Sequence, residues 1–473
     1  MDRHSGFSPP QIIGNVSEFD DDGKLKRTGT VWTATAHIIT AVIGAGVLTL
    51  AWGIAQLGWL IGIATVVIFA CITLYTSNLL ADCYRFPDSV TGKRNYTYME
   101  AVKTILGGKM YVICGLVQHS CLAGFAIGYT ITTSTSMVAI RKTDCYHKNR
   151  GDEGSCMFSN NPYMIGLGIL EIFLSQIPSF HKLSWLSTVA AITSFGYSFI
   201  GIGLSLSTII RGNGQKTSIT GVSVGPDLSV ADKTWNMMVA LGNIALASTF
   251  AQILFDIQDT LRSSPPENKV MKKANTMGIT VMTILFLLCG CSGYAAYGDK
   301  TPGNILTKGV REPFWLVDLG NLFIVVHLVG AYQVIIQPFY LAVETWAGMR
   351  WLDSKFVTKE HPVRFGKMKF SVNLFRLIWR TIFVILATIL AMAMPFFNLM
   401  LGLLGAIGFW PLVVYFPLKM YITQNKIRKL TMPWFGLQML NLSCLSVSLA
   451  AAVASIHGFG NALGKYKPFM YKE

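Results

Sequence analysis

Residues 36–53 read AHIITAVIGAGVLTLAWG, an apolar run with two glycines, Gly44 and Gly46, near its middle. Its composition is typical of a helix that crosses a lipid bilayer, which needs about 20 apolar residues. Glycine destabilises a helix interior by about 1 kcal/mol relative to alanine. The stretch therefore predicts a membrane helix that is weakened, and open to interruption, at its centre.

The whole chain has the composition of a membrane protein. Of its 473 residues, 52% are hydrophobic and 13% are charged, whereas a soluble domain carries about 25% charged residues. The net charge of +15 comes from basic residues scattered over loops between apolar runs. Such loops set membrane topology. We therefore expect the lipid bilayer, and no nucleic acid, as a partner.

Eleven apolar segments are long enough to span a bilayer. Lys and Arg are more numerous in the loops on the side of the N-terminus, which places that terminus in the cytoplasm. With an odd number of spans, the C-terminus lies outside. We expect an all-α polytopic membrane protein with a cytoplasmic tail over residues 1–30 and an extracellular tail over residues 458–473. The expected spans are 31–54, 57–81, 109–140, 162–180, 184–210, 236–257, 272–297, 314–343, 374–394, 396–418 and 433–457.

The sixth span repeats the anomaly of the first. It contains ALGNIALASTFAQILFDIQ, in which Gly242 and Asn243 are followed by small residues. Secondary transporters often contain two blocks of helices in inverted topology, with discontinuous helices at matching positions. Two weakened helices five spans apart therefore predict a 5+5 inverted-repeat core. Its repeats cover residues 31–210 and 236–418, and the helix over 433–457 is additional.

Paired interruptions provide a binding site made of backbone. Unwinding over the five residues from 43 to 47 would expose N–H groups facing one half-helix and C=O groups facing the other. A helix N-terminus favours a carboxylate, and freed carbonyls favour an ammonium group, so two breaks together can hold an amino-acid backbone. Taken alone, the Gly-Ala-Gly run is better explained by close helix packing through small residues. The second break favours the binding site.

Several ionisable side chains lie in or near the apolar runs. A charge at the bilayer centre costs about 2.5–3.5 kcal/mol on insertion scales, so such residues usually face a cavity or a partner. Histidine and a buried aspartate can titrate near neutral pH, which makes His37, His327 and Asp256 candidates for carrying a proton. Packing roles for the histidines and a solvated helix end for Asp256 remain alternatives. The full set is His37, His119, His327, Glu171, Asp256, Asp318 and Arg380.

The polar loop CYHKNRGDEGSC contains Cys145 and Cys156 on the expected outer side, where an oxidising compartment would allow them to pair. A CxxC metal knuckle is absent from the sequence, so we expect no metal site. The sequence also has no HExxH metal helix and no Gly-rich phosphate loop. We therefore expect no enzyme and no cofactor.

Seven long motifs extend over nearly the whole chain: AHIITAVIGAGVLTLAWGIAQLGW (36–59), DCYRFPDSVTGKRNYTYMEAV (82–102), SQIPSFHKLSWLS (175–187), IQDTLRSSPPENKVMKKA (257–274), CGCSGYAAYGDKTPGNILT (289–307), EPFWLVDLGNLFIVVHLVGAYQV (312–334) and FWPLVVYFP (409–417). In this order they closely resemble the plant amino acid permeases of the amino acid/auxin permease family. The resemblance implies a LeuT-like fold and proton-coupled amino acid symport by alternating access at the plasma membrane. It also implies transport roles for His37 and His327, and an unwound substrate segment from Ile43 to Val47.

The sixth span departs from the family pattern. Many relatives read GDIAFAYA where this chain has GNIALAST, and His119 stands in the third span where tyrosine is usual. These changes leave open the transport of auxin-like or GABA-like compounds, or a non-transporting amino acid receptor on the same scaffold. The expected substrate contacts are Ile43, Gly44, Ala45, Gly46, Val47, Gly242, Asn243, Ala245, Leu246, Ser248 and His119.

Overall fold

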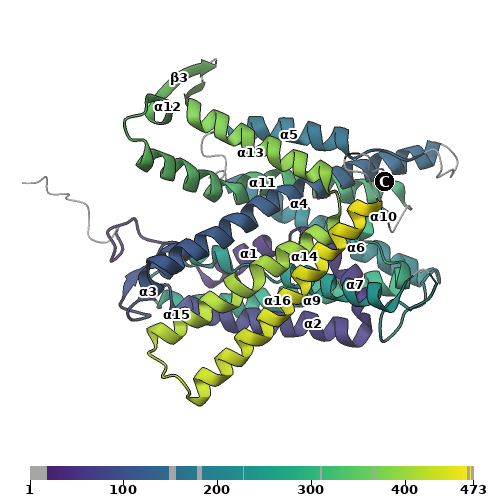
Figure 1. The fold of residues 1–473 in the computed structure, drawn as a ribbon, viewed down its shortest axis with the longest axis horizontal. Helices are drawn as coiled ribbons and strands as arrows, with labels where there is room; N and C mark the ends of the chain where they lie inside the picture. Colours follow the sequence, from purple (N-terminus) through teal and green to yellow (C-terminus); the bar gives the residue numbers. More distant parts are fainter. Residues whose placement is uncertain are drawn as a thin grey trace, which may run out of the picture.

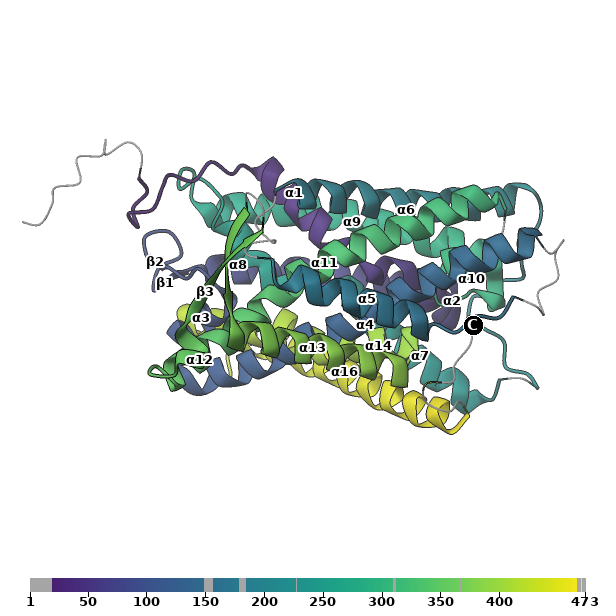
Figure 2. The same cartoon turned by 90° about the horizontal axis from the view of Figure 1, so that it is seen from above.

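The computed structural model describes residues 19–148, 156–177, 184–226, 228–308, 312–365, 368–465 and 469. Most of its helices lie side by side and run along a common direction (Figure 1 and Figure 2). The α-helices are α1 (Val31–Val42), α2 (Leu50–Asp82), α3 (Tyr98–Leu106), α4 (Gly108–Lys148), α5 (Asn161–Ser175), α6 (Ser184–Ile210), α7 (Val230–Ala247), α8 (Leu254–Gln258), α9 (Glu267–Tyr297), α10 (Ile305–Lys308), α11 (Phe314–Arg350), α12 (Lys355–Thr358), α13 (Leu374–Ala393), α14 (Phe397–Gly408), α15 (Phe416–Gln424) and α16 (Met432–Lys465). A π-helical segment, Phe409–Tyr415, joins α14 to α15.

The helices have the length and composition of membrane spans. Two apolar helices, α1 and α5, are shorter, and large apolar side chains such as Leu60 and Phe173 are exposed on outer surfaces. The chain is thus a multi-pass membrane protein, while the number of eleven spans and the inverted repeat stay predictions. Within the described residues, nine segments are long and apolar enough to cross a bilayer: Gly46–Asp82, Gly108–Lys148, Val189–Ile210, Val230–Gln258, Glu267–Lys300, Phe314–Arg350, Leu374–Ala393, Phe397–Gln424 and Met432–Lys465.

Two antiparallel hairpins add short strands to the helical body. The strands β1 (Arg85–Phe86) and β2 (Lys93–Arg94) pair between α2 and α3. The strands β3 (Glu360–Phe365) and β4 (Met368–Asn373) pair between α12 and α13. Both hairpins lie at the same end of the helices as α3 and α12, whereas α10 lies at the opposite end (Figure 2). We call the end of the helices that carries both hairpins the hairpin end.

A bend separates the first and second predicted spans. Gly58 interrupts α2 with φ +81° and ψ 173°, a backbone conformation that glycine adopts without steric cost. An ideal Cβ at Gly58 would lie 2.2 Å from the Ile219 carbonyl oxygen and 2.3 Å from the Gly221 nitrogen. The chain therefore turns where the sequence places the boundary between the two spans.

The predicted break in the first span is confirmed. Helix α1 ends at Val42, Ile43 caps it, and Gly44 is extended with φ −127° and ψ −155°. A 3-10 helix, Ala45–Thr49, then leads into α2.

The break in the sixth span is displaced from its predicted position. Gly242 and Asn243 lie inside α7, which continues to Ala247, and the helical path resumes only at the 3-10 helix Ala251–Ile253 before α8. Gly242 has a packing function, because an ideal Cβ there would lie 2.4 Å from the Gly402 carbonyl oxygen of α14. The prediction of a break at Gly242 and Asn243 is wrong for this reason.

Of the predicted tails, residues 1–18, 466–468 and 470–473 lie outside the described residues. The last helix continues to Lys465, beyond its expected end at residue 457. A disulfide bond joins Cys145 and Cys156, whose Cα atoms are 5.9 Å apart.

An ion cluster ties the start of the chain to the hairpin end. Arg27 pairs with Asp22 at 2.7 Å and with Asp259, just after α8, also at 2.7 Å. Backbone bonds reinforce this junction, since the N–H of Gly29 donates to the Thr260 carbonyl at 2.9 Å. The N-terminal ion cluster comprises Asp20, Asp21, Asp22, Arg27, Arg85, Arg94, Asp259 and Glu267.

The second half of the N-terminal ion cluster surrounds Glu267 at the start of α9. Arg85 and Arg94, from the first hairpin, each pair with Glu267 at 2.8 Å, and both also pair with Asp21. Glu267 and Arg94 are buried, where paired charges are costly to separate. The cluster thus joins the N-terminal segment, the first hairpin, α8 and α9.

Candidate functional site

The two helix breaks touch each other. An ideal Cβ at Gly46 would lie 2.9 Å from Cα and 3.1 Å from Cβ of Ala247, the last residue of α7. Only a residue without a side chain fits there. The first break, Ile43–Val47, which includes the start of the 3-10 helix, therefore lies directly against the end of α7, where the second break, Ser248–Phe250, begins.

The first break presents both kinds of backbone group. Gly44 offers no side-chain cap to the 3-10 helix that follows it, and the first N–H groups of a helix have no partner within that helix. Those of Ala45 and Gly46 therefore form a positively polarised end that favours an anion. On the other side, the carbonyls at Ile43 and Gly44 end α1.

A tyrosine that the sequence did not single out bonds to these carbonyls. The hydroxyl of Tyr197, on α6, donates to the Gly44 carbonyl at 3.1 Å and lies 3.5 Å from the Ile43 carbonyl. Its ring contacts His327 edge-on, with centroids 5.8 Å apart. The available signal was a hydroxyl-bearing aromatic inside an apolar run, since a buried Tyr hydroxyl usually has a partner.

His327 faces the same region from α11. Its Nδ1–H donates to the Ala190 carbonyl of α6 at 3.1 Å, because a carbonyl can only accept. This bond leaves Nε2 as the nitrogen that can gain a proton. The structure therefore brings His327 to the first break through Tyr197.

The second break satisfies its own carbonyls with hydroxyl groups. The Ser248 hydroxyl donates to the Ile244 carbonyl at 3.1 Å, and the Thr249 hydroxyl donates to the Ala245 carbonyl at 2.9 Å. Side chains of this kind compete with the helical ladder and favour its ends. Thr132 of the continuous helix α4 makes the same kind of bond, so Ser248 and Thr249 accompany the break without marking it in the sequence.

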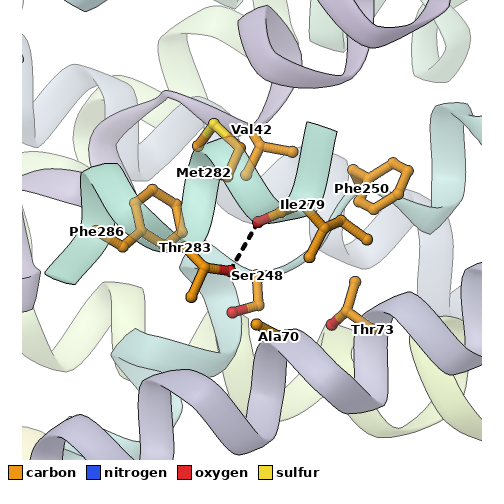
Figure 3. Close-up of a pocket in the computed structure, with 9 residues that line it drawn as sticks. All are labelled: Val42, Ala70, Thr73, Ser248, Phe250, Ile279, Met282, Thr283 and Phe286. Carbon is orange, nitrogen blue, oxygen red and sulfur yellow. Dashed lines mark hydrogen bonds between the residues drawn. The ribbon is translucent and has the colours of Figure 1, made fainter. Parts of the chain in front are cut away.

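A small cavity lies beside the second break. Its volume of about 20 Å³ is enough for a water molecule and too small for an amino acid. Ser248 contributes to its wall, together with the end of α1 and parts of α2 and α9 (Figure 3). The lining residues are Val42, Ala70, Thr73, Ser248, Phe250, Ile279, Met282, Thr283 and Phe286.

Asn243 is a buried amide just before the second break. It is fully buried in α7, and among the described residues neither its Oδ1 nor its Nδ2 has a hydrogen-bond partner. Buried polar groups are nearly always paired. An unpaired amide close to the break is therefore a candidate contact for a polar ligand.

The remaining predicted residues are spread out. Leu246 is buried against apolar side chains of α4 and α14, and Ala245 lies within the last turn of α7. His37 is exposed on α1, and Asp256 is exposed on α8. His119 bonds to the Gly115 carbonyl of its own helix at 2.6 Å.

His119 also contacts the Phe339 ring of α11, with centroids 5.8 Å apart. The structure thus brings the first break, the second break and His327 together, whereas His119 contacts α11 at Phe339, and His37 and Asp256 are exposed on α1 and α8. In the described part of the chain, no group of three or more His, Cys, Asp or Glu side chains is placed to hold a metal ion.

Comparison with known proteins gives close relatives over the full fold. The family model "Transmembrane amino acid transporter protein" matches residues 27–459. Amino acid permease 8 of Arabidopsis thaliana is 54% identical over 456 residues, which cover 96% of each chain. Amino acid permease 1 of the same plant is 52% identical over 452 residues, which cover 95% of this chain and 93% of that protein.

One solved structure, titled "Inward facing conformation of Mhp1", aligns with a TM-score of 0.52 at 12% identity. The alignment covers 94% of this chain and 93% of that chain. At this identity the likeness shows a shared fold, as the predicted LeuT-like core requires. With the family model matching most of its length and relatives above 50% identity, the chain belongs to the transmembrane amino acid transporter family, among the plant amino acid permeases.

Proposed function

We propose that this permease imports amino acids together with protons across the plasma membrane, by alternating access. The observation that supports the proposal is the close approach of Gly46 to Ala247, which places the two helix breaks next to each other. Freed backbone at membrane depth is tolerated only where it lines a cavity or is buried in protein. A site of this kind suits a small zwitterion.

The polar backbone groups of the breaks suit the two charged ends of the substrate. The substrate carboxylate binds the N–H groups of Ala45 and Gly46, where the helix dipole favours negative charge. Its ammonium group binds carbonyls at the ends of α1 and α7. Asn243 and Ser248 supply further polar contacts, and Leu246 an apolar one. Binding by backbone groups needs no charged side chain, so the site can lie inside the membrane.

His327 is the proton carrier that we favour. Its Nδ1 is held by Ala190, so that Nε2 takes up and releases the proton. A charge on His327 acts on the first break through Tyr197, whose hydroxyl bonds to the Gly44 carbonyl. Histidine changes charge near neutral pH when unperturbed. The contacts of Tyr197 would transmit the electrostatic effect of that charge to the substrate site.

The N-terminal ion cluster is the gate on the cytoplasmic side in this proposal. The excess of Lys and Arg in the loops supports a cytoplasmic hairpin end. The cluster holds the start of α1 and the end of α8 against the first hairpin and α9. Opening towards the cytoplasm must separate some of these pairs, and closing must restore them.

Electrical recording during uptake tests the proposal. Cells that lack their own amino acid uptake would express the chain, and currents would be recorded while each of a panel of amino acids, GABA and an auxin is applied. We expect a saturable inward current that grows as external pH falls. One proton per substrate can drive accumulation by several hundredfold, because 100 mV contributes about 2.3 kcal/mol and one pH unit about 1.36 kcal/mol.

Two results would contradict the proposed proton-coupled import of amino acids. Uptake that is indifferent to pH and voltage would remove the proton-coupled form. Binding of amino acids without any flux in reconstituted vesicles would favour a receptor instead.

A further inference from the structure

A buried carboxylic acid lies on α5, which packs against α4, α11 and α13. Glu171, on α5, is 1% exposed and faces Gln333 of α11, which is fully buried. The Gln333 amide contacts Glu171 Oε2 at 2.5 Å and the Glu171 carbonyl at 3.3 Å. Acidic residues inside a membrane are expensive and usually have a function.

The positively charged side chain where α13 packs against α5 bonds to groups other than the Glu171 carboxylate. Arg380, on α13, donates to Glu344 Oε1 at 2.7 Å and to the Ser175 carbonyl at 2.5 Å. Its guanidinium also lies 4.9 Å from the centroid of the Tyr340 ring. Glu171 therefore has no salt bridge within the described residues. An ionised carboxylate in such a place carries a large desolvation cost, which a bound proton removes.

The surroundings of Glu171 contain several polar atoms that lack partners. Among the described residues, Glu171 Oε1, Gln333 Oε1 and the hydroxyls of Tyr332 and Tyr340 are buried without hydrogen bonds. Tyr332 and Tyr340 both interact electrostatically with Glu171. Groups with a purely structural role are normally satisfied. Glu171 thus has one unpaired oxygen of its own, and groups on α11 whose hydrogen-bonding capacity is unused among the described residues.

The short contact fits a protonated acid. N–H···O bonds usually measure about 2.7–3.2 Å, whereas O–H···O bonds measure about 2.5–3.0 Å. The oxygen and nitrogen of a glutamine amide are interchangeable in position. With the amide turned over, the Glu171 Oε2–H would donate to the Gln333 carbonyl oxygen, in place of the two bonds that the amide N–H group makes to Glu171.

We propose that Glu171 is a proton-binding site, in which the carboxylate gains a proton to become a neutral acid held by Gln333 and loses it again during the transport cycle. The proposal deepens, and rests on, the proton coupling proposed above. Gln333 lies six residues after His327 on α11, about 9 Å along the helix axis. Glu171 thus offers the proton a second position beyond His327.

The groups that face Glu171 come from three helices. Besides Gln333, α11 contributes Tyr332 and Tyr340, and nearer its end Glu344, which pairs with Arg380 of α13. The third helix packed against α5 is α4. The titratable side chains in its first part, residues 108–130, are Lys109, Tyr111, Cys114, His119, Cys121 and Tyr129, of which His119 is bonded to its own helix.

Infrared spectroscopy of the purified full-length chain tests proton binding directly. At neutral pH exposed carboxyl groups are ionised, so the C=O stretch of a protonated carboxyl reports a buried acid. We expect this band in the wild type and in a Glu312→Gln control, whose altered residue is exposed. The band should be missing in Glu171→Gln.

A second variant keeps this test decisive if Glu171→Gln does not fold. In Gln333→Met the acid loses its hydrogen-bond partner, so the band should remain and move to higher frequency. A wild type without the band from neutral to mildly acidic pH would overturn the proposal. So would a band that is unchanged in both variants.

Transport by the same variants tests the role of the bound proton. In reconstituted vesicles, Glu171→Gln should retain exchange of labelled amino acid across the membrane. Accumulation driven by one unit of pH gradient should fall by about ten-fold, the ratio that one proton supplies. Full pH-driven accumulation in this variant would overturn the transport role of Glu171. If the wild type itself shows no pH-driven accumulation, the proposed function fails while the infrared result still decides proton binding.

Discussion

Gly46 and Gly44 look alike in the sequence and differ in the structure. An ideal Cβ on Gly46 would lie 2.9 Å from Ala247 Cα, whereas one on Gly44 would have nothing within 4 Å. Gly44 has φ −127°, which other residues also adopt. The steric requirement for glycine therefore belongs to Gly46 alone. The sequence marked both glycines equally, because the contact partner is about 200 residues away in the chain.

Gly46→Val should abolish uptake while the protein still reaches the membrane. Forcing extra methyl groups into a packed contact costs typically about 1–3 kcal/mol, and here the side chain would push the two breaks apart. Gly44→Ala is the matched control and should retain uptake. The measurement is labelled amino acid uptake normalised to surface protein. Wild-type uptake by Gly46→Val would contradict the site.

Tyr197→Phe should weaken substrate binding without removing the contact of the ring with His327. The lost hydroxyl leaves the Gly44 carbonyl with the Val47 N–H, at 3.3 Å, as its donor. A hydrogen bond of this kind contributes about 0.5–1.5 kcal/mol, so apparent affinity should fall by up to about ten-fold. Tyr294→Phe is the control, because its hydroxyl bonds to the Ser218 backbone away from the breaks. Equal affinity in Tyr197→Phe and the wild type would show that the hydroxyl has no role.

At the scale of elements, the two breaks were not equally visible in the sequence. The first was predicted at Ile43–Val47 because glycine weakens a helix. The second was expected at Gly242, which in fact allows α7 to pack closely on α14. Its actual position is at Ser248 and Thr249, whose hydroxyl groups bond to carbonyls of the preceding turn. Glycine alone could not distinguish close packing from a break.

The N-terminal ion cluster is an element with a defined response to pH. Hydrogen bonds from Arg27 outweigh desolvation and hold the pKa of the Asp22 carboxyl well below its usual value. A group with a lowered pKa stabilises the fold fully above its unfolded pKa, which is about 3.9 for aspartate. That stability is lost only as the pH falls through the folded pKa. The cluster should therefore stay charged over the physiological range.

Asp22→Asn should lower the thermal stability by the same amount at neutral and at mildly acidic pH. Charge-assisted hydrogen bonds contribute about 1.5–3 kcal/mol each, so a drop of a few degrees in Tm is expected. Asp88→Asn, at an exposed turn of the first hairpin, should change Tm little. A difference between wild type and Asp22→Asn that vanishes on mild acidification would contradict the assignment of the lowered pKa.

At the scale of the whole molecule, composition predicted the membrane class and the order of the helices. Composition could not predict the ion pairs of the N-terminal segment, because Arg27 and Asp259 are 232 residues apart in the chain. The acidic run Asp20–Asp22 looks like a solvated tail until the hairpin with Arg85 and Arg94 folds against it. Local patterns specify helices, whereas long-range charge pairs emerge only from the fold.

The structure of the chain with a transported amino acid bound tests the central claim most directly. We expect the substrate carboxylate to lie within hydrogen-bonding distance of the N–H groups of Ala45 and Gly46. We expect the ammonium group to lie against carbonyls at the ends of α1 and α7. An amino acid bound away from both breaks, or two uninterrupted helices in the bound state, would contradict this claim.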